Sequence, residues 1–221
     1  SWAGLGQLTH LMRKLLPGLT HWRAFHQDIG HDVDCYHAES EGVTYLLDPL
    51  LPEREIGFLQ QVAPPSHIYM TNRLHDRSCA DYARAVDATV WCNRHGLHEY
   101  VDDPLDVQPF DAGDVLPGGV RTIEVGLLCP DETALLLPID TGVLAIADSL
   151  IRFDFANRTH DGAIGFVPDS LIGDDAEHIK TQTKALYLDV CDRYAFDHVI
   201  FAHGELLIGD AKQQLRSFCD R

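Results

Sequence analysis

Side chains that can bind metal ions follow apolar runs at three places in this chain. The segment Thr71–Arg77 contains His75 and Asp76, while Asp148 and His203 each directly follow a later apolar run. Carboxylate and neutral imidazole groups suit Zn²⁺ and similar divalent ions, which lower the pKa of bound water toward neutrality. These residues could therefore hold a cation and support hydrolysis, provided that the fold brings them together.

The elements that must position these residues alternate between predicted strands and helices. Apolar, β-branched runs predict strands at residues 33–39, 43–48, 66–70, 88–92, 120–125, 133–137, 142–147 and 198–202. Helical periodicity or composition predicts helices at residues 53–62, 77–86, 174–194 and 210–219, and a short one that ends at Pro17-Gly18. Turns and antiparallel strands are expected over 102–119, and the aperiodic stretch 151–173 predicts a long functional loop.

The order and spacing of the polar segments resemble those of the metallo-β-lactamase superfamily over roughly residues 33–220. In that family an H-x-H-x-D-H loop, a later Asp turn and a G-H-G-like turn supply metal ligands. The resemblance implies that Asp76, Asp148 and His203 are the metal ligands of this chain. It also implies a divergent member with a degenerate motif, because family histidines are replaced by Asn72, Leu74, Arg77 and Leu127.

This resemblance and the element order predict an α/β (α+β) fold, namely a four-layer αββα sandwich of two mixed β-sheets flanked by helices. We expect residues 1–20 to form an N-terminal extension and residues 21–221 to form a single metallo-β-lactamase-like domain. Dispersed cysteines without a C-x-x-C pair, and the lack of a visible signal peptide, predict a cytoplasmic protein.

Two functions remain open at this point. The first is a hydrolase of a small ester, lactone or thioester that uses zinc or another divalent metal at no more than one site. The second is a non-catalytic descendant of the fold that binds a small molecule or a protein partner. There, Arg77, with Arg73 nearby, would pair with Asp76 and Asp148 and replace the metal's charge.

His75 lies one residue out of register with the motif and is a candidate for catalysis or for an additional ligand position. The alternative is a loop histidine hydrogen-bonded to the backbone. Other histidines before and within the first predicted strands, among them His31 and His37, are expected at the surface.

The charge of the chain limits its partners. The formal net charge is −17 over 221 residues, which makes this an acidic protein. Such a field repels phosphate groups, so the composition argues against nucleic acid and anionic membranes as partners. A small-molecule substrate or ligand is the expected partner.

Overall fold

The computed structural model describes residues 12–52, 62–103 and 105–221. Within these ranges, a first sheet holds seven strands in the order β1-β2-β3-β4-β5-β6-β7, and a second holds five in the order β12-β11-β10-β9-β8. The strands of the first sheet are β1 (Arg13–Leu16), β2 (Leu19–His26), β3 (His31–Ser40), β4 (Val43–Leu47), β5 (His67–Tyr69), β6 (Thr89–Asn93) and β7 (Val107–Phe110). Those of the second are β8 (Val115–Leu116), β9 (Val120–Glu124), β10 (Thr133–Leu137), β11 (Val143–Ile146) and β12 (His198–Phe201).

Both sheets are mixed. The strands β1 to β4 pair antiparallel, whereas β4 to β7 pair parallel. In the second sheet β8 to β11 pair antiparallel and β11 pairs parallel with β12. Because β4 is parallel to β5 and β11 is parallel to β12, the carboxyl ends of each pair lie at the same edge of their sheet. Loops at that edge can carry polar groups.

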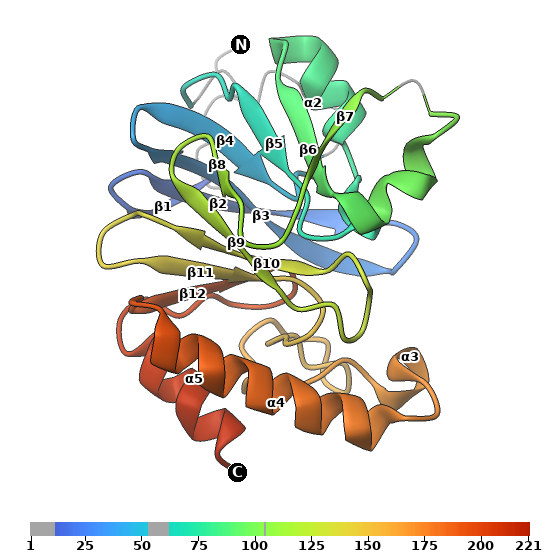
Figure 1. The fold of residues 1–221 in the computed structure, drawn as a ribbon, viewed down its shortest axis with the longest axis vertical. Helices are drawn as coiled ribbons and strands as arrows, with labels where there is room; N and C mark the ends of the chain where they lie inside the picture. The colour runs from blue at the N-terminus through green and yellow to red at the C-terminus, as the bar shows by residue number, and fades with distance from the viewer. Residues whose placement is uncertain (1–11, 53–61, 104) are drawn as a thin grey trace, which may run out of the picture.

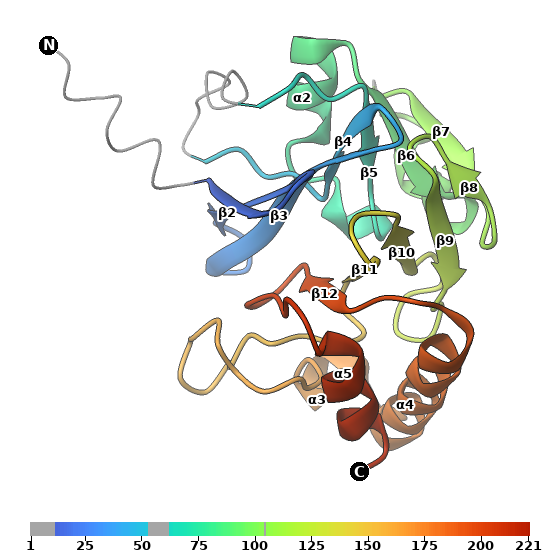
Figure 2. The ribbon, with the colours of Figure 1, turned by 90° about the vertical axis from the view of Figure 1, so that its left-hand side faces the viewer.

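Helices cover the outer face of each sheet, as Figures 1 and 2 show. The helices are α2 (Cys79–Val86), α3 (Asp169–Ile172), α4 (Ala176–Arg193) and α5 (Ala211–Cys219), with 3₁₀ turns η2 (Arg73–His75) and η3 (Arg94–Tyr100). Buried side chains of α2 pack on the first sheet, and those of α4 and α5 pack on the second.

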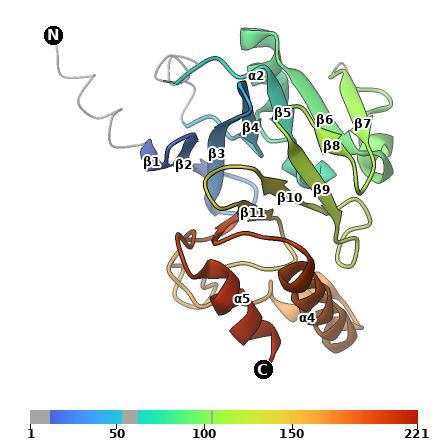
Figure 3. The ribbon, with the colours of Figure 1, turned by 60° about the vertical axis from the view of Figure 1, so that its left-hand side comes forward.

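A further core fills the space between the sheets. Tyr36, Tyr45 and Tyr69 of the first sheet join Leu135 and Ile200 of the second in one buried cluster. Figure 3 shows the two sheets lying between the helices in side view. The predicted four-layer αββα sandwich of two mixed sheets is confirmed.

The start of the described chain differs from the prediction. The prediction of a helix that ends at Pro17-Gly18 is wrong. Instead, β1 and β2 form an antiparallel hairpin, which places residues 13–20 in the first sheet. Gly18 is required at the turn, since its φ is +85° and an added Cβ would lie 2.6 Å from the Glu39 carbonyl oxygen. Pairing of β1 with β2, which is itself paired with β3, outweighs the local helical pattern. Residues 1–11 lie outside the described residues.

The other predicted elements agree with the structure to within a few residues, with two exceptions. The predicted helix 53–62 lies outside the described residues except at Val62. Among the described residues of the region 102–119, β8 is antiparallel to its neighbour, whereas β7 joins β6 as a parallel strand. Among the described residues, no helix combines the length and apolar character needed to cross a membrane.

Candidate metal centre

Loops at the carboxyl ends of parallel strands carry the polar residues of the site. Asp48 follows β4 and the turn η2 follows β5, while Asp148 and His203 follow β11 and β12. Carboxyl ends of parallel neighbours meet at one edge of a sheet, so each sheet contributes side chains from two adjacent loops.

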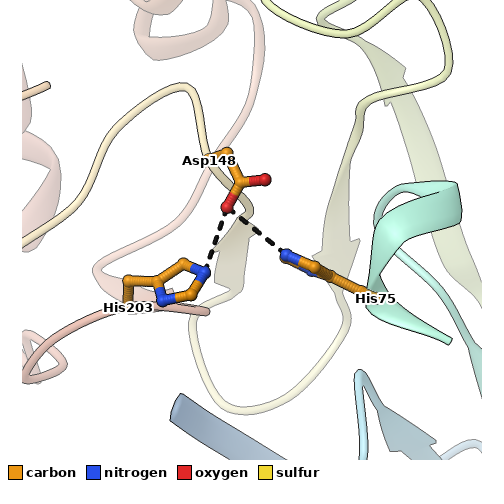
Figure 4. A group of neighbouring side chains, drawn as sticks. All are labelled: His75, Asp148 and His203. Atoms are coloured by element: carbon orange, nitrogen blue, oxygen red, sulfur yellow. Dashed lines mark ion pairs between the residues drawn. The ribbon is translucent and has the colours of Figure 1, made fainter. Parts of the chain in front are cut away.

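Three of these side chains form one group of possible metal ligands, and their ligand atoms lie within 4.8 Å of one another: His75, Asp148 and His203 (Figure 4). Asp148 Oδ1 lies 3.3 Å from His75 Nε2 and 3.1 Å from His203 Nε2. The side chains of His75 and His203 are 6% and 12% exposed, and that of Asp148 is 22% exposed. The carboxylate is therefore the most accessible member of the group.

The 3₁₀ geometry of η2 explains why His75 belongs to the site. In a 3₁₀ helix side chains three positions apart lie on the same face. Asn72 and His75 accordingly both point inward and are buried, whereas Leu74 and Asp76 are exposed. The motif spacing would place residues 72, 74 and 76 on the inner face, whereas the 3₁₀ turn places 72 and 75 there.

The structure brings together two of the three predicted ligands. Asp148 and His203 meet as expected, but the third member of the group is His75, and Asp76 is not part of it. The carboxylate of Asp76 instead accepts a hydrogen bond from the Arg77 backbone N–H. The alternative interpretation of His75 as a loop histidine bonded to the backbone does not hold, because its ring contacts the carboxylates of Asp48 and Asp148.

Asp48 holds the other side of the His75 ring. His75 Nδ1 lies 2.9 Å from Asp48 Oδ2, and the Thr71 backbone N–H and hydroxyl also donate to the Asp48 carboxylate. The Asp48 side chain is 4% exposed. A carboxylate on the far nitrogen fixes ring orientation, so the Nε2 of His75 is left to face the centre.

The charges in this group depend on one another. Burial alone would lower the pKa of His75, but the Asp148 and Asp48 carboxylates raise it to about 9. Burial would raise the pKa of Asp148, yet the charge on His75 and hydrogen bonds from both imidazoles hold it well below its usual range. Burial lowers the pKa of His203, and contact with Asp148 offsets this only in part. In the absence of a metal, these shifts in pKa favour a protonated His75 and a neutral His203.

A buried carboxylate on β3 fixes the loop that carries His203. Asp34 Oδ2 accepts from the Gly204 backbone N–H at 2.7 Å, and Tyr36 donates to the Phe201 carbonyl at 2.8 Å. Gly204 has φ +109°, and an added Cβ would lie 2.3 Å from the Arg152 carbonyl carbon. Only glycine therefore fits directly after His203.

Two histidines expected at the surface are buried. His31 Nε2 lies 3.4 Å from His203 Nδ1, and the His31 ring stacks on Phe153 with centroids 4.2 Å apart. His37 donates to the carbonyl of Ala63. Their places within β3 put both side chains on packed faces of the sandwich.

The proposed arginine–carboxylate network does not form among the described residues. Arg77 donates to the carbonyl oxygens of Asp48 and Asp34, at 2.7 and 3.3 Å. Arg73 pairs with Asp131 and Glu99. Both guanidinium groups bind other partners. The negative charge of Asp148 therefore faces the imidazoles of His75 and His203 and, within the described parts of the chain, no arginine.

The donor set fits one divalent ion. Imidazole and carboxylate ligands bind Zn²⁺ at roughly 2.0–2.2 Å, which places ligand atoms roughly 3.0–3.5 Å apart in a tetrahedral or octahedral shell. The two contacts of Asp148 Oδ1, 3.1 and 3.3 Å, fall in this range. The carboxylate behind His75 is also typical of metal-binding histidines.

Comparisons with known proteins concern the fold. The sequence matches no family model and no curated protein. Among solved structures, a flavodiiron protein from Giardia intestinalis matches with a TM-score of 0.63 and 18% identity over 95% of this chain and 58% of that one. A metallo-β-lactamase family protein from Thermus thermophilus matches with a TM-score of 0.61 and 15% identity over 94% of this chain and 80% of that one.

A B3 metallo-β-lactamase with an active-site glutamic acid also matches, with a TM-score of 0.60 and 14% identity over 98% of this chain and 91% of that one. The chain spans about 60% of the length of the flavodiiron chains. At such identities, the likeness is one of fold.

Proposed function

Because this chain has the metallo-β-lactamase fold, we propose that it is a hydrolase that holds at most one divalent metal ion between His75, Asp148 and His203. The observation that supports this most directly is the convergence of two imidazoles and one carboxylate from three loops. When bound, zinc or a similar ion would activate water and polarise a carbonyl group.

The residues of the chain have distinct roles in this proposal. Asp48 fixes the His75 ring, and Asp34 fixes the loop of His203 through the Gly204 N–H. Asp148 is the most exposed of the three ligands, so a substrate would approach from its side. We propose a small ester, lactone or thioester as substrate, since each presents a single carbonyl carbon to a nucleophile.

The side chains at the other motif positions support the proposed limit of one ion. Among the residues that the structure describes, a single group of possible ligands is present. The amide of Asn72 is occupied by other hydrogen bonds, and Leu74 is 59% exposed. Arg77 stands where the motif has a histidine ligand, and its cationic guanidinium cannot coordinate a metal ion.

Hydrolysis of a small panel of activated esters, lactones and thioesters tests this function. We expect chelated protein to be inactive, one equivalent of Zn²⁺ to restore turnover, and Asp148→Asn to lower kcat/KM by more than about 100-fold, because the shared carboxylate ligand is lost. Turnover that survives both chelation and Asp148→Asn would contradict the proposal.

Metal affinity should depend on pH. A metal must displace the proton from His75, whose pKa is raised to about 9 by Asp148 and Asp48 in the metal-free protein. Affinity should therefore rise about tenfold per pH unit between about pH 7 and 9, with release of about one proton, and level off above that range. Zn²⁺ competition titrations in buffers of different ionisation enthalpy measure both quantities. A pH-independent affinity would contradict the assignment of His75 as a ligand.

A second candidate is a non-catalytic member of the fold that binds a small molecule or protein partner. The observation that favours it is the ion pairing of His75 with both carboxylates, which balances their charge without a metal. Metal analysis separates the two candidates, since this second protein would bind no ion at micromolar Zn²⁺.

A further inference from the structure

Asn72 lies at the first turn of the metal-binding loop and is fully buried. It caps η2 with extended backbone, φ −154° and ψ 167°. An isolated buried amide is costly unless its donor and acceptor are both satisfied. Here both are engaged: the donor contacts Asp148 of the candidate metal centre, and the acceptor contacts the turn that carries His75.

The amide oxygen holds the turn that carries His75. Asn72 Oδ1 accepts a hydrogen bond from the Leu74 backbone N–H at 2.9 Å. This is a helix N-cap contact, which satisfies an N–H group that has no partner within the turn. Since His75 is the next residue, the cap fixes the direction in which its ring leaves the backbone.

The amide nitrogen holds the carboxylate of the second sheet. Asn72 Nδ2 donates to Asp148 Oδ2 at 2.9 Å. The other carboxylate oxygen of Asp148, Oδ1, then faces the Nε2 atoms of His75 and His203. One side chain therefore joins the first sheet's loop to the second sheet's loop at the point where two ligands meet.

We propose that Asn72 is a positioning residue that sets the placement of His75 relative to Asp148 and so determines metal affinity. This inference rests on the proposed function. The amide of Asn72 combines an acceptor for the cap with a donor for a carboxylate. Leucine offers neither group, and aspartate would accept at the cap but repel Asp148.

Two variants and one matched control test the proposal. Asn72→Ala removes both contacts, whereas Asn72→Ser keeps a cap acceptor for Leu74 but cannot reach Asp148. Asn93 provides the control. Its side chain caps η3 through the His95 N–H and donates to the Thr133 hydroxyl, both at 2.9 Å, and it is 4% exposed. It makes the same type of cap and donates one side-chain hydrogen bond, here to a hydroxyl and not to a carboxylate, without joining metal ligands.

The readouts are Zn²⁺ affinity by competition titration and the visible absorption spectrum of the Co²⁺-loaded protein. We expect both Asn72 variants to bind Zn²⁺ about 10–100-fold more weakly, as is typical when a group that orients ligands is lost. Their Co²⁺ spectra should also change, because ligand geometry relaxes. Asn93→Ala should reduce thermal stability but keep wild-type affinity and spectrum.

The contrary outcomes are distinct. Wild-type affinity in both Asn72 variants, or equal weakening in Asn93→Ala, would overturn the positioning role while leaving the metal centre in place. If Asn72→Ala does not fold, Asn72→Ser decides alone. A wild-type chain that binds no ion would overturn the proposed function and this inference together.

Discussion

His75→Gln should lose divalent metal binding by a factor of about 100 or more, whereas Asp76→Asn should bind like the wild type. The two residues are adjacent, yet the His75 side chain is 6% exposed and lies in the ligand group, while Asp76 is exposed and accepts a hydrogen bond from the Arg77 backbone N–H. Isothermal titration with Zn²⁺ on chelator-treated proteins compares them directly.

This pair of variants separates the structure from the motif. A ligand set read from H-x-H-x-D-H spacing assigns the role to Asp76, and the geometry of η2 assigns it to His75. If Asp76→Asn lost the metal and His75→Gln retained it, the ligand set proposed above would be wrong. Circular dichroism of both metal-free variants serves as the control for folding.

Asp48→Asn should destabilise the metal-free protein by about 3–5 kcal/mol. The substitution removes one partner of a buried ion pair and leaves the charge on His75 with Asp148 alone. Asparagine is the appropriate replacement because Asp48 has φ +44°, a conformation that Asn tolerates. Urea unfolding at pH 6, where His75 carries its proton, measures the effect.

Asp140→Asn is the matched control for this experiment. Asp140 also has a positive φ, +51°, and its carboxylate lies 2.8 Å from His198 Nε2, but its side chain is 52% exposed. Solvent screens an exposed pair of this kind, so Asp140→Asn should unfold close to the wild type. Equal losses of unfolding free energy in the two variants would show that the buried Asp48–His75 pair contributes no more to stability than the exposed pair.

Sequence reasoning succeeded where a residue directly follows a strand. Asp148 and His203 could be placed because β11 and β12 are short, apolar and clearly bounded, so the next polar side chain must lie at the strand end. The sandwich architecture was implied by the family resemblance together with the same runs, since buried strands and amphipathic helices have different periods. These features are local and need no knowledge of side-chain packing.

Positions that depend on backbone detail could not be predicted in this way. Whether 72 and 75 or 72, 74 and 76 face inward depends on the 3₁₀ turn, which spacing alone does not reveal. Asp48 carried a usable signal, because it directly follows the strand β4 and precedes Pro49. Its partner could not be inferred, since the Asp48–His75 contact joins residues from separate loops.

The most direct test of the central claim is the anomalous diffraction of a Zn²⁺-soaked crystal, recorded on both sides of the zinc absorption edge. We predict one peak per chain, roughly 2 Å from His75 Nε2, an Asp148 carboxylate oxygen and His203 Nε2. A peak that instead lies beside Asp76, or a map without zinc between the three side chains at saturating Zn²⁺, would contradict the account.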